Sequence, residues 1–83
     1  MNRRRLLKRL LSGAVANVPF ADLADLVRGF GFHLERVSGS HHIFVHPDLA
    51  ELVNIQNVRG EAKPYQIKQL LRLVERYNLK LEE

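Results

Sequence analysis

Residues 39–47 read Gly-Ser-His-His-Ile-Phe-Val-His-Pro and hold three of the four histidines of this 83-residue chain. The β-branched and aromatic residues at 43–45, followed by a proline, favour a β-strand. A Ser-Gly pair at 38–39 separates this strand from an earlier stretch in which apolar and polar residues alternate. Together these features predict a β-hairpin whose arms span 32–37 and 40–46.

Helical periodicity flanks the hairpin on both sides. Residues 3–11 carry pairs of leucines four positions apart, and residues 20–30 repeat apolar side chains every three or four positions. Residues 52–56 form a short third strand in this interpretation. Pro64 suits the first turn of a last helix, because the amide hydrogen that proline lacks would be unpaired there. The buried stripe of that helix is predicted to be Ile67, Leu70, Leu71 and Val74, with Leu73 and Tyr77 on its flanks.

The predicted order is therefore two helices, three strands and a final helix. A small three-stranded antiparallel sheet with the helices packed on one face satisfies every apolar stripe with short connections. We predict an α+β protein in which residues 1–19 form a basic helix and connector and residues 20–83 form the main domain.

Composition narrows the functional classes. The chain has no cysteine, which excludes disulfides, a cysteine nucleophile and thiolate zinc ligands and fits a reducing cytoplasm. No apolar run approaches the roughly 18 residues of a membrane span. Lys8 and Arg9 interrupt the apolar stretch that follows the basic start, so export is not expected and we predict a cytoplasmic protein.

The positive charge is concentrated at the start of the chain. Residues 1–12 hold five bases and no acid, whereas the remainder is nearly neutral. Such an arm predicts an anionic partner, most often nucleic acid, and a solvated helix face explains the pattern equally well. A membrane-surface role is not expected, because the helix is short and lacks aromatic anchors. The candidate RNA contacts in this segment are Arg3, Arg4, Arg5, Lys8 and Arg9.

The histidines admit three interpretations. A metal site is disfavoured, because His42 and His46 in a strand lie roughly 13 Å apart at about 3.3 Å per residue, and no carboxylate is spaced to complete a ligand set. Packing against the sheet is the second interpretation, and we favour it for His33 and His46. Proton transfer on RNA is the third, since RNA supplies its own 2′-hydroxyl nucleophile and needs only proton transfer and charge stabilisation. His41 and His42 point to opposite faces, so parity alone does not identify the exposed ring.

Residues 39–47 lie between a predicted helix on one side and a further predicted strand and helix on the other. In this setting the segment resembles the HicA family of bacterial toxins. The resemblance covers about residues 20–77. It implies a fold like that of the double-stranded-RNA-binding domain, α-β-β-β-α, to which the first helix is an addition. It also implies an mRNA interferase: an endoribonuclease that needs no metal or cofactor, cleaves mRNA and inhibits translation. The implied partner is a HicB-type antitoxin, and operator DNA would be bound only through the complex of the two proteins.

The resemblance also suggests site residues. Its catalytic histidine corresponds to His41 on the simplest alignment, with His42 a close second, and Ser40 would orient the imidazole or contact phosphate. Phosphate contacts along the last helix would come from Lys63, Tyr65, Lys68 and Arg72, which are equally well explained as solvent-facing residues. The region 54–58 lacks the histidine that many members carry in the third strand, which indicates a divergent branch. The alternative function is a non-catalytic RNA- or protein-binding module of the same fold.

Overall fold

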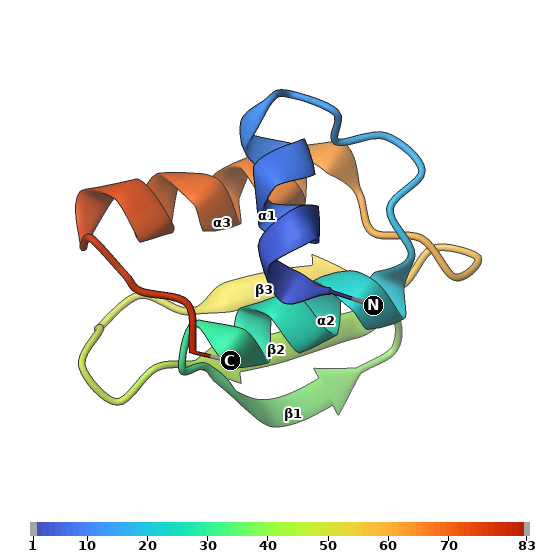
Figure 1. Ribbon diagram of the computed structural model, residues 1–83. Coiled ribbons are helices and arrows are strands. Elements are labelled where there is room, and N and C mark those ends of the chain that lie inside the picture. Colours follow the sequence, from blue (N-terminus) through green and yellow to red (C-terminus); the bar gives the residue numbers. More distant parts are fainter. Residues whose placement is uncertain (1, 83) are drawn as a thin grey trace.

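The computed structural model describes residues 2–82 and confirms the α+β prediction (Figure 1). Its elements, in order, are α1 (Arg3–Leu11), α2 (Phe20–Gly29), β1 (His33–Ser38), β2 (His41–Val45), β3 (Val53–Gln56) and α3 (Pro64–Arg76). The strands form one antiparallel sheet in the order β1-β2-β3, so β2 is paired on both sides. The predicted strand boundaries agree with the observed ones to within one residue.

Local chemistry explains where these elements begin and end. Asn2 caps α1, because its side-chain oxygen accepts a hydrogen bond from the Arg5 amide at 3.0 Å. Pro64 occupies the first turn of α3, as the sequence predicts. Between α2 and β1 the backbone of Gly31 has φ +95°, a conformation that residues with a Cβ rarely adopt.

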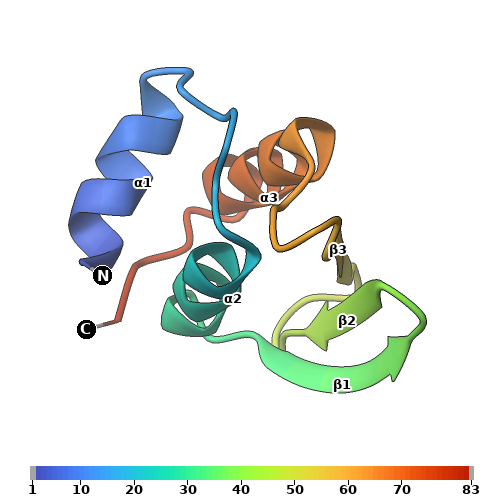
Figure 2. The same cartoon turned by 90° about the vertical axis from the view of Figure 1, so that its right-hand side faces the viewer.

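The elements stack in three layers (Figure 2). The sheet forms one side, α2 and α3 lie against one of its faces, and α1 lies on the far side of those helices. The core fills the space between sheet and helices and includes the fully buried Phe44 and Ile55 from the strands. No helix within residues 2–82 covers the other face of the sheet. All six residues of β1 are exposed, because the helices extend over β2 and β3 and leave β1 uncovered.

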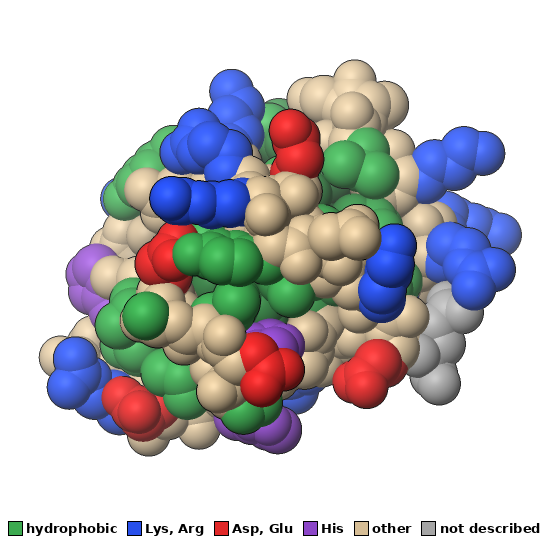
Figure 3. Space-filling model, turned by 90° about the vertical axis from the view of Figure 1, so that its left-hand side faces the viewer, with side chains coloured by type: hydrophobic (Ala, Val, Ile, Leu, Met, Phe, Trp, Pro, Cys, Tyr) green, Lys and Arg blue, Asp and Glu red, His purple; other side chains and the backbone are tan. Residues whose placement is uncertain are grey.

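The basic helix α1 packs against α2. Leu6 and Leu10 enter the core, and Leu7 is half-buried. The leucine spacing predicts one apolar stripe of Leu6, Leu7, Leu10 and Leu11, and this is wrong for Leu11, which is 65% exposed. At 3.6 residues per turn Leu11 lies about 140° around the helix from Leu6, so it leaves the apolar face. In Figure 3 the Lys and Arg side chains at the right gather over α1, on the side away from the sheet.

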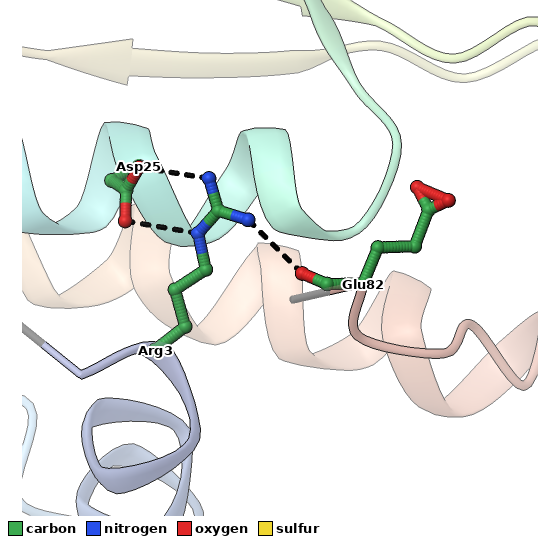
Figure 4. A network of polar contacts seen from close by, with 3 residues as sticks. All are labelled: Arg3, Asp25 and Glu82. Carbon is green, nitrogen blue, oxygen red and sulfur yellow. Dashed lines mark hydrogen bonds and ion pairs between the residues drawn. The ribbon is translucent and has the colours of Figure 1, made fainter.

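A bidentate ion pair fixes the start of α1 (Figure 4). Arg3 Nε and Nη2 donate to the two carboxylate oxygens of Asp25 on α2, both at 2.9 Å, and Nη1 donates to the Glu82 carbonyl at 3.0 Å. The Glu82 amide in turn donates to the carbonyl of Gly29. Gly29 permits this approach, since a Cβ there would lie 2.8 Å from Leu81 Cδ1 and 2.9 Å from Arg3 Cδ. We call this contact between α1, α2 and the residues after α3 the clasp. Within residues 2–82, no helix has the length and apolarity needed to cross a bilayer.

The ion pair of the clasp predicts a pH-dependent contribution to stability. Hydrogen bonds from Arg3 hold the pKa of the Asp25 carboxyl below its ordinary value. The stabilisation is therefore complete above the unfolded-state pKa of about 3.9 and is lost as the pH falls through the lower folded-state pKa. Because the pair is partly exposed, Asp25→Asn should lower the free energy of unfolding at pH 7 by only about 0.5 kcal/mol.

Urea unfolding between pH 7 and pH 2.5 tests this. The difference between wild type and Asp25→Asn should shrink toward the acid end, as the Asp25 carboxyl becomes protonated. Arg5→Gln, on the solvent side of α1, serves as the control and should leave the pH dependence unchanged. Equal stability of Asp25→Asn and wild type at every pH would show that the pair contributes nothing.

Candidate active site

Five segments meet at one end of the sheet, the end that faces the viewer in Figure 2. The hairpin turn, the start of β2 and the end of β3 lie there because the strands are antiparallel, and His41 pairs with Gln56. The Asn57 amide donates to the Ser40 carbonyl at 3.0 Å, which joins the chain after β3 to the hairpin. The Phe20 amide donates to the Gly60 carbonyl at 2.8 Å and brings in the first turn of α2. The first turn of α3 completes the group.

His42 lies on the helix-facing side of β2. Its ring centroid is 4.5 Å from that of Phe20, the first residue of α2. Its Nδ1 lies 3.1 Å from the Ser40 carbonyl oxygen. A carbonyl oxygen only accepts, so Nδ1 of the neutral ring carries the hydrogen and Nε2 keeps its lone pair.

His41 lies on the opposite, helix-free face. Its Nδ1 is 3.0 Å from Oδ1 of Asn54 on β3. Asn54 pairs with Ile43, two residues along the same face of β2, so its amide reaches the ring diagonally across the strands. The amide oxygen accepts the Nδ1 hydrogen, and Nε2 of His41 is again left as a base. The two neighbouring histidines, both half-buried, thus have the same tautomer on opposite faces.

Gln56 links the hairpin to α3. Its backbone amide donates to Oε1 of the buried Gln66 at 2.7 Å, and Gln66 Nε2 donates back to Oε1 of Gln56 at 3.2 Å. Two longer contacts of 3.4 Å join the Gln56 side chain to the Ser40 and Tyr65 hydroxyls. These bonds fix the first turn of α3 to the end of β3, beside the residue that pairs with His41.

The structure brings together some of the sequence-predicted site residues. Ser40, His41, His42 and Lys63 lie at this end of the sheet. Lys63 precedes α3, and its ammonium is 5.9 Å from the Tyr65 ring centroid. Lys68 is exposed further along α3.

The five bases of α1 lie apart from that group, beyond α2 and α3 (Figure 2). Some of them contact the protein itself. Arg3 binds Asp25 and Glu82, and Arg9 Nη2 donates to the Ala16 carbonyl at 2.7 Å. Arg4, Arg5 and Lys8 are exposed. RNA contact by these five residues stays a prediction.

Sequence reasoning missed Asn54, Gln56 and Phe20 as partners of the site. A signal for the first two was present, since Asn54 and Gln56 alternate with the buried Val53 and Ile55. The alternation places both on the strand side away from the core, but only the cross-strand register shows that Asn54 reaches His41.

The remaining histidines occupy other positions. His33 begins the exposed strand β1. His46 packs its ring edge-on to Phe32 at 5.1 Å, and its Nδ1 accepts from the Asp48 amide at 3.1 Å. Among residues 2–82, no three His, Asp or Glu side chains are grouped so as to hold a metal ion.

A groove of about 570 Å³ lies near the other end of the sheet, between α3 and the loop that joins β2 to β3. It is lined by Glu51, Leu52, Gln69, Arg72, Leu73, Glu75 and Arg76. Arg76 spans it with an ion pair to Glu51 at 3.4 Å. Arg72, one of the predicted phosphate contacts, therefore lies apart from His41 and His42.

Comparison with known protein families identifies a match over most of the chain. Residues 20–75 match the family model described as "HicA toxin of bacterial toxin-antitoxin". The match covers more than half of the chain, contains both candidate histidines and leaves α1 outside. No curated protein and no solved structure matches the chain.

The geometry around His46 predicts unequal costs for two glycine substitutions. Gly31 and Gly13 have nearly the same φ, +95° and +98°, so alanine strains the backbone similarly at both. A Cβ on Gly31 would also lie 2.9 Å from His46 Nε2, whereas one on Gly13 meets nothing within 4 Å. Gly13→Ala should therefore cost about 1 kcal/mol and Gly31→Ala about 2–3 kcal/mol of unfolding free energy.

Urea denaturation of both variants measures the difference. In a His46→Ala background the additional cost at Gly31 should disappear, because the ring that the new methyl group meets is gone. Equal costs at the two glycines in the wild-type background would show that His46 does not pack as described.

Proposed function

This chain belongs to the HicA family of toxins from bacterial toxin–antitoxin systems, and from this we propose that it is a metal-independent endoribonuclease with His41 as general base. The observation that carries the assignment is the contact between His41 and Asn54. It fixes the imidazole in the tautomer that leaves Nε2 able to take a proton, on the face of the sheet without helices.

The environment of His42 supports the choice of His41 as the general base. The ring of His42 packs against Phe20 on the helix-facing side. Neighbouring strand residues point to opposite faces, so the two rings do not act on the same phosphodiester. We assign His42 to orientation of the hairpin turn, through its contact with the Ser40 carbonyl.

The reaction balances without a metal or an added nucleophile. Nε2 of His41 takes the proton of a ribose 2′-hydroxyl as that oxygen bonds to the adjacent phosphorus. The bond from phosphorus to the 5′-oxygen breaks, and this oxygen leaves with a proton from solvent. The products are a 2′,3′-cyclic phosphate and a 5′-hydroxyl. Lys63 lies at the same end of the sheet and supplies positive charge for the phosphoryl oxygens.

Membership of the family also implies an antitoxin partner. In our proposal that partner is of the HicB type and covers the histidine end of the sheet. The toxin would cleave mRNA in the cytoplasm and thereby inhibit translation, and it would reach operator DNA only as part of the complex.

The two histidines provide matched substitutions. His41→Ala should slow RNA cleavage at least 100-fold, the scale on which a general base contributes, and His42→Ala should slow it less than tenfold. Cleavage of a labelled RNA by purified protein in excess EDTA measures both rates, with circular dichroism and urea denaturation as folding controls.

The reverse ranking would move the base to His42. Full activity of the double variant would remove both histidines from the chemistry. RNA retention without cleavage by the wild-type protein would favour the non-catalytic binding module.

Asn54 should act as a positioning residue. Asn54→Ala frees the ring of His41 and should lower kcat about tenfold with KM little changed. Asn54→Asp keeps an acceptor on Nδ1 and adds a negative charge, which favours the protonated ring of His41 over the neutral one.

Because a general base must be unprotonated, the acid limb of the kcat profile should move to higher pH in Asn54→Asp. Steady-state rates from pH 5 to pH 9 measure this shift. A profile identical to wild type, at whatever absolute rate, would mean that Asn54 acts only through the fold.

A further inference from the structure

We infer that Tyr65, together with Lys63, forms a subsite for an unpaired base of single-stranded RNA beside His41. This inference rests on the proposed function and specifies its substrate class. It concerns residues in the first turn of α3 and just before it, where the structure places an aromatic ring and a cation next to the histidine end of the sheet.

The ring of Tyr65 is held in place but not buried. The residue is 53% exposed, among the most exposed large apolar side chains within residues 2–82. Its hydroxyl donates to Gln56 Oε1 and accepts from Gln66 Nε2, both at 3.4 Å. The side-chain amides of Gln56 and Gln66 are also hydrogen-bonded to each other, so the partners that hold the Tyr65 hydroxyl are themselves fixed.

The position relative to His41 follows from the same bonds. Gln56 is the direct cross-strand partner of His41. The hydroxyl of Tyr65 thus contacts the side chain of the residue that pairs with the proposed base. A nucleotide that stacks on Tyr65 would place its neighbour's ribose and phosphate near the histidine.

Tyr77, the other tyrosine of the chain, shows that exposure alone does not make such a site. It lies just after α3, at the opposite end of that helix, and is 38% exposed. Its hydroxyl donates to the Glu51 carboxylate, which raises the pKa of Tyr77 above its ordinary value. This bond ties the end of α3 to the loop before β3, so Tyr77 has a structural role that accounts for its position.

The pairing of aromatic ring and cation identifies the ligand. Unpaired bases stack on exposed aromatic rings without regard to sequence, and nearby cations hold the phosphates that flank them. The Lys63 ammonium lies 5.9 Å from the ring centroid, within reach of both the ring and a phosphate. Bases inside a duplex are already stacked on one another. The subsite therefore selects single strands, although the fold resembles one named for binding duplex RNA.

The test uses full-length protein in a His41→Ala/His42→Ala background, so that binding is measured without cleavage. The probe is a short single-stranded RNA that contains 2-aminopurine, whose fluorescence falls when the base stacks. Tyr65→Ala should weaken binding about tenfold and abolish the quenching, since a stacked base loses affinity on this scale when its aromatic partner is removed. Tyr65→Phe keeps the ring and should retain both.

Two further variants separate the contributions. Lys63→Ala should weaken binding and reduce the slope of affinity against salt by about one phosphate contact, while the quenching at saturation persists. Tyr77→Ala, the matched control, should change neither quantity. The same RNA annealed to its complement should bind more weakly and show no dependence on Tyr65.

If Tyr65→Ala binds the single-stranded RNA with the affinity and the quenching of the protein that retains Tyr65, the subsite is wrong. Tighter binding of the duplex than of the single strand would also overturn it. If the wild-type protein cleaves RNA and Tyr65→Ala binds normally, the subsite is wrong and the proposed function stands. If the single strand stacks on Tyr65 but the wild-type protein cleaves no RNA, the nuclease proposal is wrong and the subsite stands. Failure to bind either RNA would overturn both.

Discussion

The pairing of β2 with a strand on each side is the constraint on which the rest of the structure depends. Side chains alternate along a strand, so once Phe44 enters the core the face of every other β2 residue is determined. His42 then faces α2, and His41 faces the side without helices. A slip of one residue in register would exchange the faces on which the two histidines lie. It would also move Phe44 out of the core, and this energetic cost opposes the slip.

The sequence predicted the elements well, because each carries a clear periodicity. Apolar spacing located the three helices, alternation located β1, and proline and glycine marked the ends. It did not decide which face of β2 was buried. Ile43 and Phe44 are both apolar and both turn out to be buried, Ile43 outside the main core, so the alternation that usually identifies the core face is missing at the decisive position.

Contacts between residues far apart in the chain could not be predicted from the sequence either. The amides of Gln56 and Gln66 are ten residues apart and meet only because α3 returns along β3. The positive charge of α1 was evident from the sequence. The position of this helix in the fold, however, depends on how Leu6 and Leu10 pack into the core. That docking places the basic helix and the strand that carries His41 on opposite sides of α2 and α3, so charge concentrated in one segment gave no guide to the position of the proposed general base.

The clasp has a consequence for the order of folding. The bond between Arg3 and the Glu82 carbonyl joins residues 79 positions apart, and the ion pair with Asp25 spans 22. Such distant contacts must repay the entropy of closing long loops, whereas the hairpin and the individual helices need only local ones. The hairpin that holds His41 is thus expected to form early and the clasp late. Loosening the clasp would then accelerate unfolding and leave the folding rate nearly unchanged.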